Sequence, residues 1–168
     1  ADVKIEKNSV SFTIDKKAHT VDRVLVATGR AANVEGFGLE GLGVRLDDRG
    51  FVKVNDRLET TVPGVYAIGD VAGPPMLAHK GQREGVVVAE RIAGQNPHPV
   101  NYGNIPNATY CHPEVASIGM TEEVCKAQQI DYRVGKFPFS ASGRARTAGE
   151  TEGFVKVIRE AKYGEILG

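Results

Sequence analysis

Apolar and polar residues alternate over the first fourteen positions of the chain. Two apolar residues precede an Asn8-Ser9 pair, and three follow it at every second position. These residues are Val3, Ile5, Val10, Phe12 and Ile14. Side chains at every second position of a β-strand lie on one face, and a polar pair between two such runs is typical of a turn. The pattern predicts a β-hairpin over residues 3–14.

Two further apolar stretches lie at residues 21–27 and 65–69, and each is closed by a glycine. The second reads Val65-Tyr66-Ala67-Ile68 and continues into Gly69-Asp70. Short apolar runs of this kind are typical of strands buried in a parallel sheet. We therefore expect two buried strands, the first ended by Gly29. The glycine-rich segment between them predicts loops with one short strand at residues 51–54.

A helical segment is expected at residues 78–93, with Gly94 where a helix commonly ends in a left-handed glycine. Gly81 and Gly85 leave one stripe of this helix without side chains. Glycine is unfavourable inside a helix, so a close approach is needed to explain the pair. Close packing of the helix and the approach of a ligand both satisfy this requirement.

The chain after the helix is interrupted by Asn96-Pro97-His98-Pro99, which predicts a domain boundary. A second helix is expected over residues 122–129, with Thr121 as its N-cap and acidic residues in its first turn. The apolar pattern predicts strands near residues 109–118, 132–137, 154–159 and 165–167. This part of the chain is therefore a sheet with one covering helix.

Asp70 and the start of the helix at Ala78 are the candidate ligand-binding groups. The C-terminal edge of an open α/β sheet is where such folds bind nucleotides. Asp70 can accept hydrogen bonds from sugar-like hydroxyls at this edge, although a turn or cap role is the common use of Gly-Asp. The free N–H groups and positive dipole end of the helix stabilise negative charge in the same crevice. The pair suits a polyol-bearing cofactor that gains negative charge.

Composition narrows the possible partners. The chain has 21 basic and 21 acidic residues and no basic run, which argues against nucleic acid and anionic membranes as partners. Neither a membrane span nor a cleavable leader is expected from the apolar pattern. Cys111 and Cys125 lack the spacing of a disulfide framework, so a reducing compartment is expected. No metal site is predicted, because Cys111 and His112 have no further ligands at workable spacing.

Four segments resemble the flavoprotein pyridine nucleotide–disulfide oxidoreductases, in the order of that family. They are Val24-Leu25-Val26-Ala27-Thr28-Gly29-Arg30, Tyr66-Ala67-Ile68-Gly69-Asp70, His112 to Gly119 and Phe137-Pro138-Phe139. The resemblance covers essentially the whole chain. It implies the C-terminal part of a doubly wound α/β nucleotide-binding fold, followed by the start of an α+β dimer-interface domain. The implied limits are residues 1–30 for the end of an NAD-binding domain, 31–100 for a returning FAD-binding segment and 101–168 for a truncated interface domain.

The resemblance also implies which residues bind the two cofactors. For FAD, Asp70 holds a ribityl or phosphate-linked oxygen, and the amides of Leu77, Ala78 and His79 meet the pyrimidine edge of the flavin. The full set of expected FAD residues is Gly69, Asp70, Met76, Leu77, Ala78 and His79. For NAD the turn Ala27-Thr28-Gly29-Arg30 is expected to contact the nicotinamide nucleotide, although a plain strand terminator explains it as well.

Several family motifs are missing from these 168 residues. No Gly-x-Gly-x-x-Gly loop and no Cys-x-x-x-x-Cys pair occurs, and His112-Pro113-Glu114 has its Glu too close to match the family's base motif. We therefore expect no catalytic residue here and no turnover by this chain alone. The chain resembles an interior slice of a longer enzyme.

Met76-Leu77-Ala78-His79-Lys80-Gly81 most resembles the branch of the family that oxidises dihydrolipoamide with NAD⁺. The resemblance implies a homodimer that serves 2-oxoacid dehydrogenase complexes, in a bacterial cytoplasm or, alternatively, a mitochondrial matrix. A related disulfide reductase of the glutathione or mercuric type is the first alternative. A dimerisation module that has kept the fold without flavin is the second.

Overall fold

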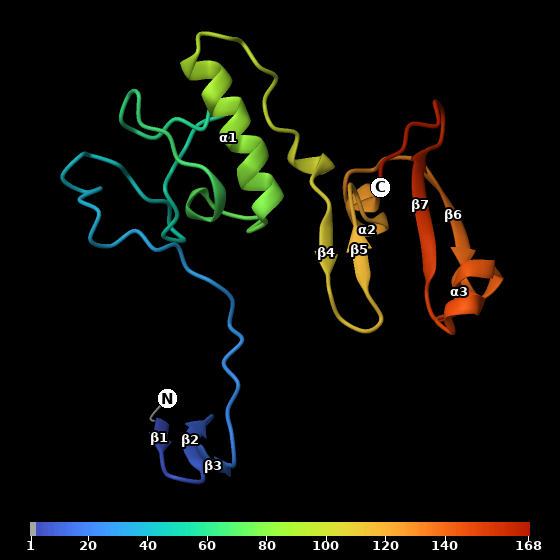
Figure 1. The fold of residues 1–168 in the computed structure, drawn as a ribbon, viewed down its shortest axis with the longest axis horizontal. Helices are drawn as coiled ribbons and strands as arrows, with labels where there is room; N and C mark the ends of the chain where they lie inside the picture. Colours follow the sequence, from blue (N-terminus) through green and yellow to red (C-terminus); the bar gives the residue numbers. More distant parts are fainter. Residues whose placement is uncertain (1–2) are drawn as a thin grey trace. The chain divides into compact units, whose positions relative to one another are not determined.

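The computed structural model describes residues 3–168 and divides the chain into two compact units. The first unit extends to Ala31, and the second covers Ala32–Gly168. Figure 1 shows the elements of both in sequence colours. Each unit is described by itself.

The first unit contains a three-stranded antiparallel sheet of β1 (Val3–Ile5), β2 (Val10–Ile14) and β3 (Lys17–Val21). Val3 pairs with Phe12 across the first turn, which confirms the predicted hairpin. Ser11 pairs with Thr20 across the second. The third strand follows a tight turn in which Asp15 and Lys16 both have positive φ.

The prediction of a buried strand at residues 21–27 is wrong. The structure assigns no regular element to residues 24–34, and Leu25 and Val26 are 89% and 77% exposed. A buried parallel strand needs neighbours that complete its backbone hydrogen bonds. Among the described residues no strand pairs with residues 22–27, and Val21 is the last residue of β3, where it pairs with Val10 of β2.

The second unit has two small apolar cores. Val44, Val52 and Ala67 are buried in the first, and Leu58, Val87 and Val88 in the second. The strands predicted at 51–54 and 65–69 are reduced to single bridges, Leu46↔Val52 and Glu59↔Tyr66. A 3₁₀ turn, η1 (Gly69–Ala72), follows directly. The two segments therefore lie at the core, as predicted, but they do not form regular strands.

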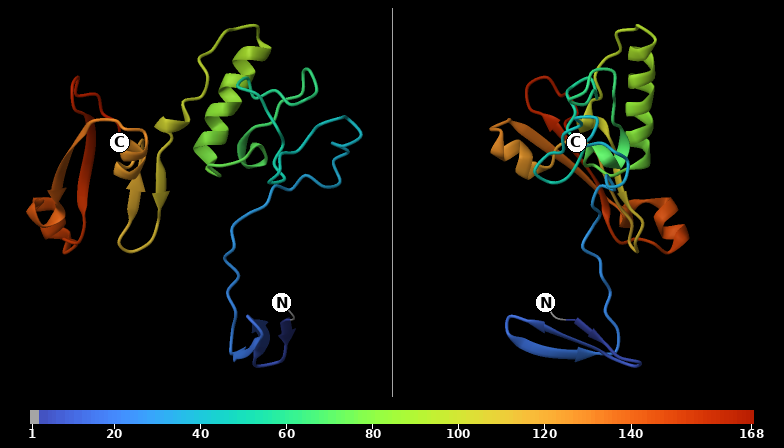
Figure 2. Two further views of the ribbon diagram at one scale, coloured as in Figure 1. Left: turned by 180° about the vertical axis from the view of Figure 1, so that it is seen from behind. Right: turned by 90° about the vertical axis from the view of Figure 1, so that its left-hand side faces the viewer.

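The predicted long helix is present as α1 (Ala78–Ile92), and it places Val87 and Val88 in the second core. Gly94 has a φ of 78° just after the helix, so the left-handed glycine end is confirmed. With 15 residues, α1 is the longest element of the second unit in sequence, and it is the green helix in both views of Figure 2.

The chain after α1 forms two hairpin sheets and two short helices. The elements are η2 (Tyr102–Asn104), β4 (Asn107–Thr109), β5 (Val115–Ser117), α2 (Glu122–Ala127), β6 (Tyr132–Pro138), η3 (Phe139–Ala141), α3 (Gly143–Ala148) and β7 (Phe154–Glu160). β4 pairs with β5 and β6 pairs with β7, both antiparallel. No helix within residues 3–168 is long and apolar enough to cross a membrane.

The structure confirms one prediction for this part of the chain and contradicts another. The helix capped by Thr121 is confirmed, because the Thr121 side chain accepts a hydrogen bond from the Val124 amide at 3.3 Å. A single strand at 109–118 is wrong, since a turn at 110–114 separates β4 from β5. Cys111 is exposed on this turn.

Candidate functional site

The predicted FAD residues lie where η1 packs against the first turns of α1. Gly69 opens η1 with a φ of 72°, in the left-handed region that favours glycine. A Cβ on Gly81 would lie only 3.0 Å from the Gly69 Cα atom, so the two backbones are in contact. At Gly85 a Cβ would lie 3.3 Å from Ile68 Cδ1. The glycine stripe of α1 is therefore explained by close packing against η1 and the residue before it.

A buried ion pair fixes the backbone of this turn. Lys80 and Glu84 have side chains only 1% exposed, and Lys80 Nζ lies 3.3 Å from Glu84 Oε1. Lys80 Nζ donates hydrogen bonds to the carbonyl oxygens of Gly69, at 2.9 Å, and Gly73, at 2.7 Å. Glu84 Oε2 accepts a hydrogen bond from the Gly69 amide at 2.7 Å. Both polar groups of Gly69 are thus satisfied by charged side chains of α1.

The far side of the turn is held by the first apolar core. Val71 and Ala72 of η1 are half-buried and pack against the core of Val44, Val52 and Ala67. The Val52 amide also donates a hydrogen bond to the Val71 carbonyl at 2.9 Å. The turn that carries Asp70 is therefore fixed by apolar packing on one side and by α1 on the other.

Tyr102 of η2 hydrogen-bonds to the ion pair and so connects it to the part of the chain that follows α1. Its hydroxyl donates a hydrogen bond to Glu84 Oε1 at 2.8 Å. Partial burial of the hydroxyl, together with the hydrogen bond and the negative charge of Glu84, raises the pKa of Tyr102 well above its usual value. The phenol is therefore a stable donor throughout the physiological pH range.

The structure places the predicted FAD residues around this turn. Asp70, Ala78 and His79 are exposed, whereas Gly69, Met76 and Leu77 are half-buried. Leu77 precedes α1 without a side-chain cap on its first amides. His79 Nε2 donates a hydrogen bond to the Pro106 carbonyl at 2.8 Å, so that nitrogen carries a proton.

The predicted NAD residues belong to the first unit. Ala27, Thr28, Gly29 and Arg30 are exposed and lie in the segment without regular structure. Gly29 has a φ of 94°, so it does occupy a conformation that favours glycine. Their contact with a nucleotide stays a prediction.

Lys80, Glu84 and Tyr102 were missed by sequence reasoning. Charged residues are almost never fully buried unless they are paired, so a helical Lys and Glu are expected on the surface. One signal was available: Lys80 and Glu84 are spaced i,i+4 beside the glycine pair, on the stripe that had to approach another backbone. Tyr102 carried no such signal.

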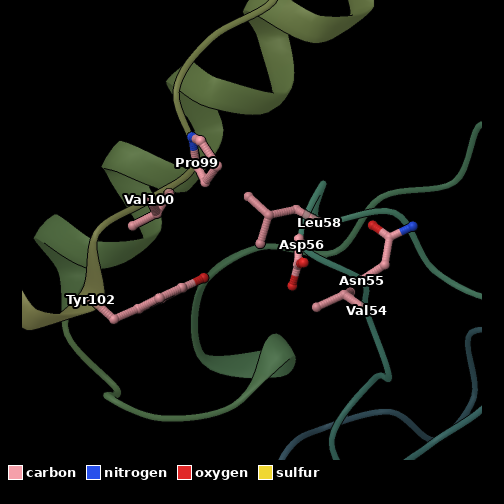
Figure 3. A pocket seen from close by; sticks show the side chains of 7 residues that line it. All are labelled: Val54, Asn55, Asp56, Leu58, Pro99, Val100 and Tyr102. Atoms are coloured by element: carbon pink, nitrogen blue, oxygen red, sulfur yellow. The ribbon is translucent and has the colours of Figure 1, made fainter.

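A cavity of about 390 Å³ lies beside the second core, and Figure 3 shows its walls. It is lined by Val54, Asn55, Asp56, Leu58, Pro99, Val100 and Tyr102. None of the predicted FAD or NAD residues lines it. Tyr102 contributes to this cavity and also contacts Glu84 of the buried pair.

Solved structures of similar fold define the class of protein. The HOCl-induced flavoprotein disulfide reductase RclA from Escherichia coli matches with a TM-score of 0.85 and 27% identity, over 98% of this chain and 38% of that one. LpdA from Mycobacterium tuberculosis matches in fold with a TM-score of 0.90 at 24% identity, over 99% of this chain and 37% of that one. The fold is that of the flavoprotein disulfide reductases.

Family profiles match two parts of the chain. Residues 1–85 match the pyridine nucleotide-disulphide oxidoreductase profile, and residues 105–168 match the dimerisation domain of the same family. The chain belongs to the pyridine nucleotide-disulphide oxidoreductase family, which confirms the resemblance seen in its four segments.

Curated relatives are similar over most of the chain. The dihydrolipoyl dehydrogenase of Cupriavidus necator is 48% identical, over 99% of this chain and 36% of the relative. That of Rhizobium etli is 50% identical, over 98% of this chain and 36% of the relative. The mitochondrial dihydrolipoyl dehydrogenase 1 of Arabidopsis thaliana is 50% identical, over 88% of this chain and 29% of the relative. The chain thus spans about a third of the length of the curated relatives it matches.

Proposed function

We propose that the protein to which this chain belongs is a dihydrolipoyl dehydrogenase. It would oxidise dihydrolipoamide to lipoamide while NAD⁺ is reduced to NADH with release of a proton. The observation that carries the proposal is the 48% identity to such an enzyme over 99% of this chain. The Met76–Gly81 segment, which leads into the first turn of α1, supports the same branch of the family.

The residues around η1 fit a flavin nucleotide. Asp70 presents an exposed carboxylate, which can accept hydrogen bonds from the hydroxyls of a sugar alcohol. The first turn of α1 offers backbone amides and a positive dipole end that favour negative charge, worth about 0.3–1 kcal/mol at an exposed site. FAD, when bound, would carry electrons between a dithiol and the nicotinamide. The expected contacts are those of Gly69, Asp70, Met76, Leu77, Ala78 and His79.

NAD is the second proposed cofactor, with Ala27, Thr28, Gly29 and Arg30 as its contacts in this chain. The proposed division is an NAD-binding end at residues 1–30, an FAD-binding segment at 31–100 and an interface domain from residue 101. The family match of residues 105–168 to a dimerisation domain supports a homodimer. We extend the proposal to 2-oxoacid dehydrogenase complexes as partners and to a bacterial cytoplasm or a mitochondrial matrix as the compartment.

This chain supplies binding groups to the reaction and no reacting thiol pair. Cys111 is exposed and Cys125 is fully buried in α2, and they are fourteen residues apart. The redox disulfide and the catalytic base are therefore proposed to come from other parts of the protein. The isolated 168-residue chain would have no turnover.

The test uses the full-length gene product that carries this sequence. The purified protein is expected to absorb near 450 nm, roughly where a bound flavin absorbs, and to form NADH from dihydrolipoamide and NAD⁺. An Asp70→Asn variant should hold less flavin, whereas Asp131→Asn, at an exposed residue outside the site, should match the wild type. A colourless protein would contradict the proposal and favour a dimerisation module without flavin.

A related disulfide reductase is the second candidate. The similarity in fold to RclA at 27% identity favours it, since that protein is described as a flavoprotein disulfide reductase. Glutathione disulfide and mercuric ion are therefore assayed beside dihydrolipoamide with the same preparation. Faster turnover with either would replace the proposed activity while leaving the flavin site intact.

A further inference from the structure

A continuous set of hydrogen bonds runs from Tyr102 to the turn that carries Asp70. The Tyr102 hydroxyl donates to Glu84 Oε1, and Glu84 Oε2 accepts from the Gly69 amide. Lys80 lies beside Glu84 and donates to the carbonyl of Gly69. The two ends of this set, Gly69 and Tyr102, have the whole of α1 between them in sequence but share one carboxylate.

The position of the Glu84 carboxylate depends on its donors. A buried carboxylate is stable only when its oxygens are paired and hydrogen-bonded. Lys80 and Tyr102 both contact Oε1, and the Gly69 amide occupies Oε2. Loss of the tyrosine hydroxyl would leave Oε1 with Lys80 alone, and the carboxylate could then shift toward the ammonium and away from Gly69.

A second contact joins the same two regions. His79, in the first turn of α1, donates a hydrogen bond from Nε2 to the Pro106 carbonyl. Pro106 lies just before β4 and within the region that matches the dimerisation domain. The segment 102–106 is therefore tied to α1 at two residues, Glu84 and His79.

We propose that Tyr102 is a positioning residue for FAD, acting through Glu84 on the Gly69–Asp70 turn. The inference rests on the proposed function, because it assigns the flavin to that turn. In this arrangement the segment that leads into the dimerisation domain helps to hold the cofactor-binding backbone in place. Tyr102 itself need not touch the cofactor.

The test compares Tyr102→Phe with Tyr163→Phe in the full-length gene product. Both changes remove one hydroxyl and keep the ring, and Tyr163 is 81% exposed at the end of the described chain. FAD affinity is measured by titration of the apoprotein, at a temperature where circular dichroism is unchanged. The dissociation constant for FAD should rise about three- to tenfold in Tyr102→Phe. This change corresponds to part of the free energy of a hydrogen bond to a charged group. Tyr163→Phe should equal the wild type.

One further readout separates positioning from general stability. The Gly69 amide should exchange its hydrogen faster in the Tyr102→Phe apoprotein than in the wild-type apoprotein, because Glu84 holds that amide less firmly. Equal FAD affinity in the two tyrosine variants would overturn the inference. A wild-type protein that binds no FAD would instead overturn the proposed function.

A second variant covers the case in which Tyr102→Phe does not fold. The double change Lys80→Met with Glu84→Leu replaces a buried ion pair by apolar side chains of similar size, which proteins often tolerate. It removes every side-chain hydrogen bond that α1 makes to Gly69. The dissociation constant for FAD should rise at least about threefold above that of the wild type, and an unchanged affinity would contradict the inference.

Discussion

At the scale of single residues, Gly81 and Gly85 are matched positions with different neighbours. A Cβ at Gly81 would meet the Gly69 Cα atom at 3.0 Å, and that atom belongs to a backbone held by Lys80 and Glu84. A Cβ at Gly85 would meet only the end of the Ile68 side chain at 3.3 Å. The first neighbour cannot move cheaply, whereas the second can rotate away.

We predict opposite effects of alanine at these two positions. Gly81→Ala should lower the free energy of unfolding by about 1–2 kcal/mol, because overpacking against a fixed backbone exceeds the gain in helix propensity. Gly85→Ala should be neutral or stabilising by about 0.5 kcal/mol, since alanine favours the helix by about 1 kcal/mol. Urea unfolding of both variants measures the difference. A Gly81→Ala protein as stable as Gly85→Ala would contradict the packing seen here.

The sequence alone identified site residues that belong to a local motif or carry a glycine requirement. It did not identify residues whose role depends on contacts with distant parts of the chain. Gly-Asp after an apolar run marked Gly69 and Asp70, and the glycine pair of α1 marked a close approach. The burial of Lys80 and Glu84 could not be predicted, because it depends on the Gly69 and Gly73 carbonyls lying opposite them. The same limit applies to Tyr102, whose partner is eighteen residues earlier.

At the scale of elements, α2 is joined to β7 by a pair of exposed charges. Lys156 Nζ donates a hydrogen bond to Glu122 Oε1 at 3.0 Å. This hydrogen bond is the main reason that the pKa of Glu122 is lowered and that of Lys156 is raised. The pKa of the neighbouring Glu123 is lowered chiefly by hydrogen bonds to its own backbone amide and to Thr121.

Lys156→Met is therefore predicted to change the pKa of Glu122 more than that of Glu123. The pKa of Glu122 should rise toward its usual value, while that of Glu123 should change less. Because folding lowers the pKa of Glu122, its stabilising effect is present above the unfolded pKa and is lost as the pH falls through the folded value. NMR titration of both side-chain carboxyl groups measures the shifts. Equal shifts at Glu122 and Glu123 would show that Lys156 acts through general charge and not through the hydrogen bond.

Helices could be predicted from the sequence because their apolar pattern and their end signals lie within their own residues. Both α1 and α2 were predicted to within two residues of their ends. The apolar runs at 21–27 and 65–69 carry the pattern of strands, but strand pairing depends on other segments. The described residues supply only a single bridge at Tyr66, and no strand pairs with residues 24–27.

At the scale of the whole molecule, the predicted cofactor residues are divided between the two units. The FAD residues lie in the second unit and the NAD residues in the first. Asp70 and the first two residues of α1, Ala78 and His79, are exposed in this chain. The curated relatives are about three times as long, so the remaining cofactor contacts are expected from segments beyond this one.

The isolated chain is therefore predicted to bind FAD far more weakly than the full-length protein. Association costs about 4–15 kcal/mol in lost translational and rotational freedom, and a few exposed contacts around one turn offset little of that cost. A ligand that binds the folded state raises its thermal midpoint in proportion to the logarithm of concentration over dissociation constant. FAD at about 0.1 mM should raise the midpoint of the full-length apoprotein by several degrees and leave that of residues 1–168 unchanged. A comparable rise in the isolated chain would mean that the turn at Gly69 and the start of α1 already form most of the binding site, and the division of contacts proposed here would be wrong.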